Sequence, residues 1–563
     1  MSDALRRLQS AVAALLLAAG SLCGVSAQAD AAAEAEVWNY RVSAGDTLIA
    51  ICTQYLARPE DWPRLQKLNG VADARRLQPD SVLRIPLAWM RQTATVADVV
   101  FVKGVASLLR TDAAGATSRR LLASGDTVQA GDTIRTAVEA SVSLRLADRS
   151  RLLITAGTEM RIVHLLQLGR DAIPKVQLQL ETGGTEIEVA PAAPGRSFEI
   201  RTPAVNLGVR GTEFRARVDG GAKLARVEVS EGRVGAQAEQ QQLAIPAGFG
   251  TVAEAGKPIA PPRQLIAAPE LGAVPKRLER VPLQFAWPAV GGAKAYRAQV
   301  LAAGEPLRLL LDGEFDAPAA RWQDLPDGSY RLRVRAIDAR GNEGHDGVAD
   351  FVLKARPEPP FTSVPAEGAK VYGDSTRFEW ASVAGARRYR LQVSSRADFA
   401  SLLVDEAGIG SSRHQLALPP GDYHWRVASI GTDADGREDP GPFGDASSFT
   451  QRAIPPTPDV QPPAAVDDGV LLRWRLPAPG HRMQFQVAGD RDFSRIVLDR
   501  STEQASALLP KPEPGVYYLR ARTIDADGFE GPFGAVQQIE VPQPPPPPPK
   551  WLLLLPLGLL LLL

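Results

Sequence analysis

A repeat in the C-terminal half constrains the fold of this chain more than any other feature. The same residues recur at intervals of 93 and 94 positions, as Trp287, Trp380 and Trp474, as Tyr330, Tyr423 and Tyr517, and as the pairs Gln299-Val300, Gln392-Val393 and Gln486-Val487. Between these markers, apolar and polar residues alternate over short segments, which is the pattern of β-strands. A repeat of this length built from such strands predicts a β-sandwich. We therefore expect three sandwiches, over residues 276–355, 356–452 and 453–542.

The repeated residues also carry a family resemblance. In the first copy they are Phe285-Ala286-Trp287, Tyr296, Leu325-Pro326-Asp327-Gly328, Tyr330 and Arg333-Val334. The second copy reproduces them as Phe378–Trp380, Tyr389, Leu418–Gly421, Tyr423 and Arg426-Val427, whereas the third has Met483 for the first tyrosine and Ala521 after Arg520. This pattern resembles fibronectin type III repeats. The resemblance implies that each tryptophan fills the core and that each repeated tyrosine forms a tyrosine corner with the backbone upstream.

Two acidic strings near the ends of copies two and three, Asp433–Gly436 and Asp525–Gly528, invite a calcium interpretation. A calcium loop needs six or more oxygen ligands, including a glutamate about twelve positions from the first ligand. Asp-Gly is also an ordinary choice for a turn between two strands. We expect turns here, no metal site and no cofactor.

Residues 95–250 also alternate with a period of two. The apolar positions include Val142, Leu144, Leu146, Val176, Leu178, Leu180, Val227, Val229 and Val234. Turns are expected at Asp148–Ser150, at Gly183-Gly184 and at Glu231-Gly232. The segment therefore predicts an all-β domain, followed by a linker over residues 251–275.

Three strings within this domain are distinctive: Ile200–Ala204, Val209–Phe214 and Glu231–Val234. Together they resemble the FecR domain family, which is named after a periplasmic regulator of ferric-citrate uptake. The resemblance supports an envelope β-module. We do not expect anti-sigma activity, because the N-terminus shows neither a sigma-factor-binding segment nor a true transmembrane helix.

The FecR-type motif residues are Arg201, Thr202, Pro203, Arg210, Gly211, Thr212 and Phe214. Its two arginines suit an anion or carboxylate ligand. Alternatively they are structural, since an arginine beside a glycine bend often pairs with a neighbour such as Glu213 or with loop carbonyls. We favour the structural interpretation.

Residues 37–88 predict a small α+β unit of strand, helix, helix and strand. The helices are expected at Thr47–Tyr55 and Asp61–Leu68, and Asn69-Gly70 supplies a left-handed cap for the second helix. The sequence Tyr40–Val42, Gly45–Leu48, Ile51, Asn69-Gly70, Leu77–Asp80 and Leu83–Pro86 resembles a LysM domain, with Asp80 where the family usually has glycine.

The LysM resemblance implies binding to N-acetylglucosamine-containing polymers, here peptidoglycan. The implied glycan-binding residues are Gly45, Asp46, Thr47, Leu48, Leu77, Gln78, Pro79 and Asp80. The side chains of Asp46 and Leu48 have an alternative role, as helix cap and core. That role does not exclude binding, because the contacts of the family are largely made by the backbone.

The two ends of the chain suggest where it works. Residues 1–29 combine Arg6-Arg7, an apolar run and the cleavage pattern Ala27–Ala29, which predicts a secretory signal peptide. Cleavage removes Cys23 and leaves Cys52, a thiol expected to be buried on a helix. At the other end, a proline-rich spacer (543–550) precedes a hydrophobic tail (551–563) that is too short for an ordinary membrane span. We expect the tail to insert shallowly into a membrane or to contact an envelope partner.

Lys+Arg and Asp+Glu are equal at 64 each, so no net charge recruits nucleic acid. The five histidines are scattered, and no unassigned segment is long enough for a hydrolase fold. We therefore expect a mainly β, multi-domain protein of the periplasm or cell envelope with no catalytic residues. Its expected role is to bind peptidoglycan and scaffold an unidentified envelope protein. A periplasmic sensor acting through a membrane partner is the alternative, and a cell-wall glycan hydrolase or its accessory is a second one.

Overall fold

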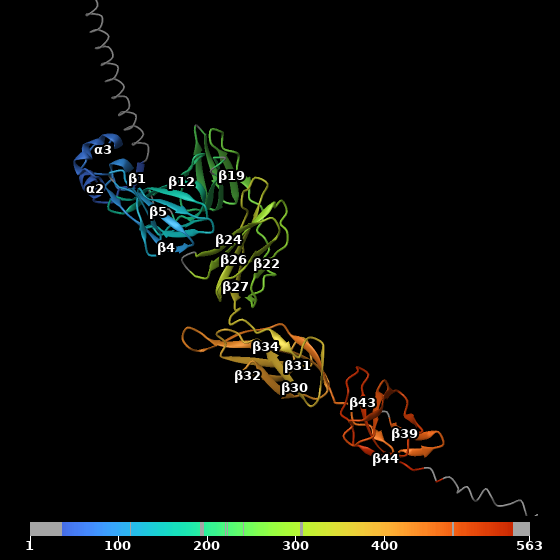
Figure 1. Ribbon diagram of the computed structural model, residues 1–563. Coiled ribbons are helices and arrows are strands. Elements are labelled where there is room, and N and C mark those ends of the chain that lie inside the picture. Colours follow the sequence, from blue (N-terminus) through green and yellow to red (C-terminus); the bar gives the residue numbers. More distant parts are fainter. Residues whose placement is uncertain are drawn as a thin grey trace, which may run out of the picture. The chain divides into compact units, whose positions relative to one another are not determined.

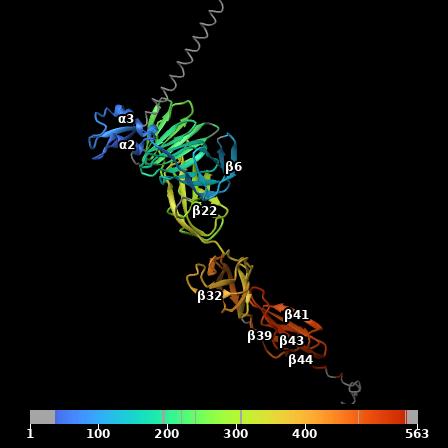
Figure 2. The ribbon, with the colours of Figure 1, turned by 90° about the vertical axis from the view of Figure 1, so that its left-hand side faces the viewer.

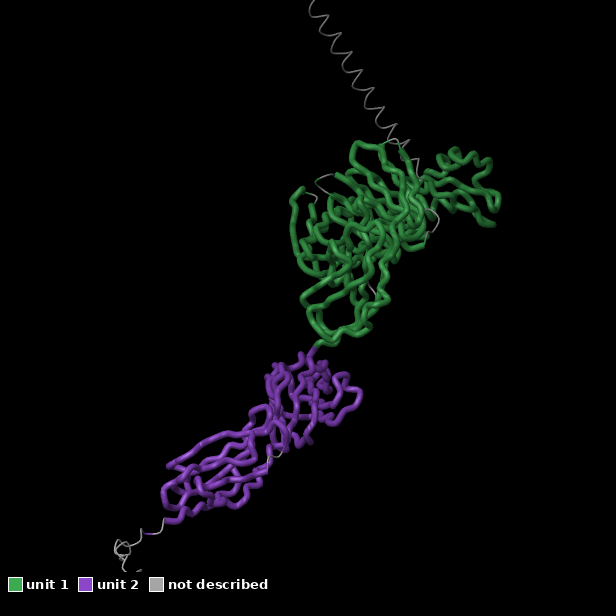
Figure 3. Tube along the Cα trace, turned by 90° about the vertical axis from the view of Figure 1, so that its right-hand side faces the viewer, with its two compact units in different colours: residues 1–355 green, residues 356–563 purple. Residues whose placement is uncertain are grey.

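The computed structural model describes residues 37–543 and 546, with gaps at 113, 192–195, 220, 222, 240, 305–307 and 476–477. The signal peptide and the hydrophobic tail predicted from the sequence lie outside the described residues, as does most of the proline-rich spacer. The contacts divide the chain into two units, residues 1–355 and 356–563 (Figure 3). The first unit holds the LysM-like domain, the FecR-type domain and the first sandwich, and the second unit holds the other two sandwiches.

The LysM-like domain has the order of elements expected from its sequence. Its elements are β1 (Val37–Arg41), α2 (Leu48–Tyr55), a 3-10 turn (Pro59–Asp61), α3 (Trp62–Asn69), β2 (Val82–Pro86) and a second 3-10 turn (Leu87–Trp89). Gly70 ends α3 in the left-handed conformation, with φ of 60°. Strands β1 and β2 pair antiparallel, and α2 and α3 lie beside them at one end of the unit (Figures 1 and 2).

The FecR-type domain consists of two sheets that share the long strand β12 (Ile173–Glu188). The first sheet runs β7 (Thr127–Val128), β4 (Ala97–Lys103), β9 (Ser141–Arg145), β10 (Arg151–Ile154), β12, β15 (Glu213–Asp219), β16 (Leu224–Glu231), β19 (Phe249–Glu254) and β20 (Arg263–Gln264). The second runs β6 (Thr117–Leu121), β5 (Ala106–Thr111), β8 (Thr133–Thr136), β11 (Glu159–Leu168), β12, β13 (Ser197–Arg201), β14 (Asn206–Val209), β17 (Arg233–Ala238) and β18 (Gln241–Pro246), with β3 (Gln92–Ala94) also on β11. The core between them is aliphatic, with Phe198 and Phe214 fully buried.

The turn expected at Gly183-Gly184 is wrong, because β12 continues through both glycines. Residues before them pair with β11, and Thr185–Glu188 pair with β10 in the other sheet. A Cβ at Gly183 would lie 2.3 Å from the hydroxyl oxygen of Thr158, and the residue has φ of 86°. The glycines are therefore needed where a strand bends from one sheet to the next, rather than where it ends.

Each sandwich pairs its strands into two sheets. The first has β21 (Arg277–Leu278), β27 (Gly347–Leu353), β26 (Gly328–Ile337), β23 (Ala295–Ala302) and β24 (Leu309–Phe315) in one sheet, and β22 (Leu283–Ala286) with β25 (Ala319–Trp322) in the other. The second has β28 (Thr362–Val364), β30 (Ser375–Trp380) and β33 (Arg413–Ala417) against β29 (Ala369–Tyr372), β36 (Ser447–Arg452), β34 (Gly421–Thr432), β31 (Arg388–Ser394) and β32 (Leu402–Ile409), with β35 (Glu438–Phe443) on β34. The third has β37 (Asp459–Val460), β39 (Gly469–Arg475), β38 (Ala464–Val466) and β42 (Ser506–Pro510) against β41 (Ile496–Thr502), β40 (Arg482–Ala488), β43 (Gly515–Ile524) and β44 (Gln537–Val541).

The repeated aromatic residues have the roles that the resemblance implied. Trp287, Trp380 and Trp474 are all buried in their cores. The hydroxyls of Tyr330, Tyr423 and Tyr517 donate to the carbonyls of Pro326, Pro419 and Glu513, over 2.5, 2.8 and 3.0 Å. The three tyrosine corners are thus formed even in the third copy, where the upstream sequence differs.

The segment predicted as a linker, residues 251–275, is packed along much of its length. Strand β20 adds to β19 of the FecR-type domain, and Leu271 and Val274 lie in the core of the first sandwich. The chain therefore passes from one domain to the next along their shared boundary.

Candidate functional site

Two loops of the LysM-like domain carry the residues implied to bind glycan. The peptide N–H of Leu48 donates to the carbonyl of Ala74 over 2.8 Å, and that of Asp80 donates to Val42 over 2.8 Å. These bonds hold the loop before α2 beside the loop before β2. The structure therefore places Gly45–Leu48 and Leu77–Asp80 next to each other.

Most side chains of the first loop support the fold. Thr47 caps α2 by accepting from the N–H of Ala50, and Leu48 is fully buried. The Asp46 carboxylate accepts from the Tyr40 hydroxyl and from the Ser43 N–H, both over 2.7 Å. What this loop offers to a ligand is its exposed backbone around Gly45.

The second loop is also exposed at its tip. Leu77 packs partly against the core, while Gln78, Pro79 and Asp80 are exposed. Asp80 has φ of 65°, the left-handed conformation that glycine adopts most readily. Its carboxylate lies 3.0 Å from Nε of Arg41, across the strand end. Within the described part of the chain, the peptide N–H groups of Leu77 and Gln78 have no hydrogen-bond partner.

The FecR-type motif residues shape two connections, the turn between β13 and β14 of the second sheet and the passage from β14 to β15 of the first sheet. The Thr202 hydroxyl accepts from the N–H of Val205 over 2.9 Å and donates to the carbonyl of the same residue, which closes the turn between β13 and β14. Pro203 lies exposed in that turn, and Arg201 lies 3.8 Å from Glu199 at the strand end.

The second part of the motif packs around a pair of glycines. Gly211 has φ of 58°, and a Cβ on Gly232 would lie 2.5 Å from the methyl carbon of Thr212. Phe214 is fully buried in the core. Arg210 is exposed, and no ion pair between it and Glu213 occurs among the described residues. The motif therefore has a structural basis, although not the arginine pairing that the sequence suggested.

Comparison with protein families agrees with both resemblances. The model described as "LysM domain" matches residues 40–86, and the model described as "FecR protein" matches residues 132–235. The chain contains a LysM domain and a FecR domain. No curated protein matches the chain.

Several solved structures are similar to parts of this chain. A candidate anti-sigma factor from Parabacteroides distasonis is 16% identical over 23% of this chain and 59% of its own, with a TM-score of 0.20. The FN1–FN3 domains of chicken CNTN1 are 15% identical over 46% of this chain and 94% of theirs, with a TM-score of 0.22. The fibronectin(III)-like modules of Clostridium thermocellum CbhA are 13% identical over 33% of this chain and 94% of theirs, with a TM-score of 0.21. This chain thus spans 59% of the first of these proteins.

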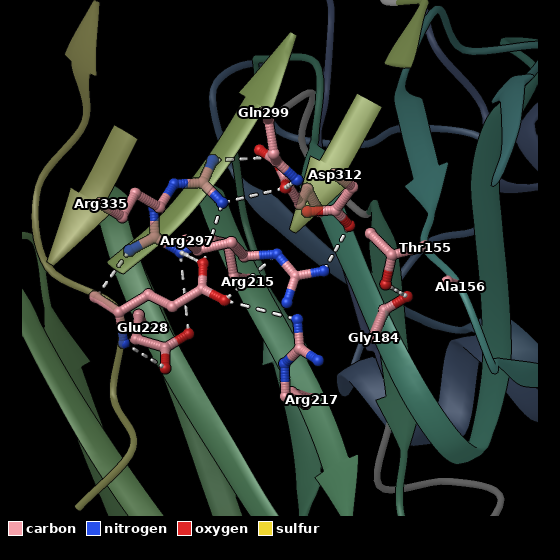
Figure 4. Close-up of polar contacts among 12 residues, drawn as sticks. Thr155, Ala156, Gly184, Arg215, Arg217, Glu228, Arg297, Gln299, Asp312 and Arg335 are labelled. Atoms are coloured by element: carbon pink, nitrogen blue, oxygen red, sulfur yellow. Dashed lines mark hydrogen bonds and ion pairs between the residues drawn. The ribbon is translucent and has the colours of Figure 1, made fainter. Parts of the chain in front are cut away.

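The sequence did not indicate that the first sandwich docks on the FecR domain. An interdomain charge cluster joins them, made of Glu186, Arg215, Arg217 and Glu228 from the FecR domain and Arg297, Asp312, Arg333, Arg335, Glu343 and Asp346 from the sandwich. Figure 4 shows part of it, with Arg215, Arg217 and Glu228 of the FecR domain facing Arg297, Asp312 and Arg335 of the sandwich. The Arg335 guanidinium donates to both oxygens of Glu186, over 2.9 and 3.0 Å, and to Glu343 over 3.0 Å.

The charges in this cluster act on one another with different results for different carboxylates. Burial alone would raise the pKa of Glu186, but Arg333 and Arg335 outweigh it and hold that pKa well below its usual range. Burial raises the pKa of Glu228 to about 7, with the Glu343 carboxylate adding to the shift and Arg215 opposing it. Beside the cluster, Leu153 of the FecR domain packs with Leu301 and Leu309 of the sandwich. The two domains therefore share one buried polar and apolar interface.

The LysM domain is also attached to the FecR domain. The Tyr55 hydroxyl donates to Asp171 over 2.6 Å, and the N–H of Gly169 donates to the carbonyl of Arg91 over 2.8 Å. Leu168 and Ile173, at the end of the β11–β12 hairpin, belong to the LysM core. The three domains of the first unit are thus packed in series.

Other candidate sites have structural explanations. Cys52 is buried on α2, and burial together with Asp61 raises the pKa of its thiol to about 12, which disfavours a reactive thiolate. Asp433 and Asp525 each accept two backbone N–H bonds inside their own turns. The described residues contain no cluster suited to a metal ion, and no helix among them is long and apolar enough to cross a membrane.

Proposed function

We propose that this protein binds peptidoglycan in the bacterial envelope through its LysM domain and scaffolds other envelope components through its β-domains, without catalysing a reaction. LysM and FecR domains are typical of envelope or periplasmic proteins. The signal peptide expected at residues 1–29 would deliver the chain across the inner membrane.

The observation that carries this proposal is the pair of adjacent loops in the LysM domain. An N-acetyl group presents one N–H and one C=O, and the exposed backbone near Gly45 and Gln78 offers the complementary groups. A single small site of this kind binds weakly, so wall attachment would gain from several copies acting together.

The test is a pulldown of the mature chain on purified peptidoglycan. Deleting residues 30–90 would uncover Leu168 and Ile173 of the FecR hairpin, so a point variant is the better probe. We expect Gln78→Trp, which places a bulky side chain between the two loops, to abolish retention. Lys67→Trp, on the exposed side of α3, is the matched control and should bind like the wild type. Equal retention of both variants would refute the assignment to these loops.

A second candidate is a periplasmic sensor that acts through a membrane partner. The packing of LysM, FecR and first sandwich in series favours it, because a ligand on the LysM domain could alter the Tyr55–Asp171 contact. Hydrogen exchange of the β11–β12 hairpin with and without glycan separates the two candidates. A sensor predicts a change in hairpin protection on binding, and a passive scaffold predicts none.

A further inference from the structure

A row of charged side chains crosses the outer face of the first FecR sheet, from β4 to β16. In strand order the row consists of Asp98, Arg145, Arg151, Glu188, Glu213 and Glu231, each directly opposite the next in the strand register. Directly opposed residues have Cβ atoms about 4.5–5.5 Å apart. Arg145 pairs with Asp98 at 3.0 Å. Beyond this pair, the row places its two arginines side by side and its three glutamates side by side.

This arrangement is unfavourable for the free protein. Glu213 stands between Glu188 and Glu231, and like charges directly opposite each other destabilise a sheet. Partial burial and the charges of Asp346, Glu231 and Glu188 raise the pKa of Glu213. Local choices that conflict with stability tend to occur at functional sites, where a ligand can relieve them.

A cleft lies over the middle of this row. Its cavity has a volume of about 150 Å³, and its lining includes Arg145, Arg151, Glu188 and Glu213 of the row. Glu186 and Arg333 are further charged residues of the lining, and the rest is mostly apolar, with Leu153 among it. A cavity of this size takes an organic group roughly as large as benzene. Arg333 belongs to the first sandwich and is held by Glu186 at 2.7 Å, so docking of the sandwich completes the cleft.

We propose that this cleft binds the head of an α-amino acid, which carries an ammonium and a carboxylate on one carbon. The carboxylate faces Arg145 and Arg151, since guanidinium groups bind carboxylates in a fixed fork geometry. The ammonium faces Glu188 and Glu213 and adds a positive charge beside Glu213, which has a glutamate on each side in the strand register.

The spacing of the row suits such a head. Arg151 and Glu188 meet at the boundary between the positive and negative halves, with Nη1 and Oε2 3.7 Å apart. A group with both charges on one carbon contacts both residues at once. A simple anion or a simple cation would satisfy only one half of the row.

An amino-acid head reaches the envelope from two sources. One is a free amino acid. The other is the side chain of diaminopimelate in the peptide branches of peptidoglycan, and this second source rests on the proposed function. In that case the LysM domain and the cleft contact the glycan and the peptide of the same polymer.

The test is calorimetric titration of the mature chain with three probes. These are free meso-diaminopimelate, the tripeptide L-Ala-γ-D-Glu-meso-diaminopimelate, and L-Ala-γ-D-Glu-L-Lys, whose side chain lacks the distal carboxylate. We expect the diaminopimelate tripeptide to bind at least about tenfold more tightly than the lysine tripeptide, the effect of one charge-assisted contact. Equal or tighter binding of the free amino acid supports the cleft and assigns the free source.

Variants locate the binding. Glu213→Gln and Arg151→Gln should each weaken it about tenfold or more, whereas Glu159→Gln, which breaks an exposed pair with Arg135 in the other sheet, should not. Because Glu213→Gln removes like-charge repulsion, it should melt no lower than the wild type, so its binding loss is not a folding defect. Absence of binding by both diaminopimelate probes, or undiminished binding in both variants, overturns the proposal.

The outcome is separable from that of the proposed function. Retention on peptidoglycan that depends on Gln78, with no diaminopimelate binding in solution, removes the cleft and leaves the LysM assignment. Diaminopimelate binding by the wild type, together with equal wall retention of Gln78→Trp, supports the cleft and removes the LysM assignment.

Discussion

The buried contact between Glu186 and two arginines allows a direct test of the interdomain interface. The Glu186 carboxylate lies 2.7 Å from Arg333 and 2.9 Å from Arg335, and the Arg335 side chain is only 3% exposed. Glu186→Gln keeps the shape and one acceptor oxygen but removes the nearest counter-ion of buried Arg333, which is left with Asp346 at 3.8 Å, while Arg335 keeps Glu343 at 3.0 Å. Breaking a buried ion pair in this way costs about 3–5 kcal/mol. We expect the lower end, about 3 kcal/mol, because the amide oxygen still accepts a hydrogen bond.

Hydrogen exchange measures this loss where it occurs. Peptides covering β12 and β26 should exchange roughly a hundredfold faster in the variant, since each 1.4 kcal/mol is about a factor of ten. The matched control is Asp350→Asn, which breaks the pair with Arg331 in the same sandwich, where the side chains are 70% and 57% exposed. Exposed pairs contribute about 0–1 kcal/mol. A loss below about 1 kcal/mol for Glu186→Gln would refute the view that this cluster holds the domains together.

Three further predictions concern single contacts. Glu228→Gln should reduce the decline in stability that we expect for the wild type as pH rises from about 4.5 to about 7, because ionisation of a carboxyl with a raised pKa opposes folding; denaturant titrations at several pH values measure it. Gly169→Ala should loosen the contact between the LysM and FecR domains, since its Cβ would lie 2.7 Å from the Tyr55 ring and 2.9 Å from Met90. Faster proteolysis between these two domains would report the change. Gly115→Ala, where the glycine is also left-handed but has open space around it, is the control and should have no such effect. Tyr423→Phe should lower the unfolding free energy of the second sandwich by about 1 kcal/mol through loss of the bond to Pro419, and unchanged thermal stability would contradict this role.

Regular and local features of the fold could be predicted from the sequence. The helices of the LysM domain begin and end within a residue of the expected positions. Thr47 caps the start of α2 and Gly70 ends α3, and both effects depend only on neighbouring residues in the sequence. The tyrosine corners follow from a bond to a residue only four positions upstream. The buried state of Cys52 follows from its apolar neighbours on one helix face.

Features that depend on contacts between domains could not be predicted in this way. Arg333 and Arg335 alternate along β26 as charged residues do on any solvated strand, so the pattern does not reveal that another domain covers them. The row of charges on the FecR sheet is also hidden, because its members come from six strands whose register only the fold establishes. The turn predicted at Gly183-Gly184 was wrong for a related reason. A strand that bends from one sheet into another requires glycine just as a turn does, so the residue type does not distinguish the two.

Comparison of the three sandwiches reveals one sequence difference that accompanies docking of the first sandwich on the FecR domain, and it concerns the surroundings of a repeated arginine. Arg333, Arg426 and Arg520 occupy the same position in the repeat, and each donates through Nε to the repeated glutamine, over 3.0, 2.9 and 2.8 Å. In the second copy, the guanidinium carbon lies 4.0 Å from the ring centre of Phe399 and 4.4 Å from that of Phe443. In the third copy, Phe493 and Phe533 hold it at 4.2 and 4.1 Å.

The first copy replaces this aromatic cover with carboxylates. Asp346 stands two residues after a glycine, as Phe443 and Phe533 do in their copies, and Arg333 lies 3.8 Å from it and 2.7 Å from Glu186 of the FecR domain. A cation covered by rings within its own domain needs no partner, whereas a cation without them must find a counter-ion when it is buried. The exchange of phenylalanine for aspartate at this position therefore distinguishes a sandwich that docks through this face from two that cover the same arginine themselves.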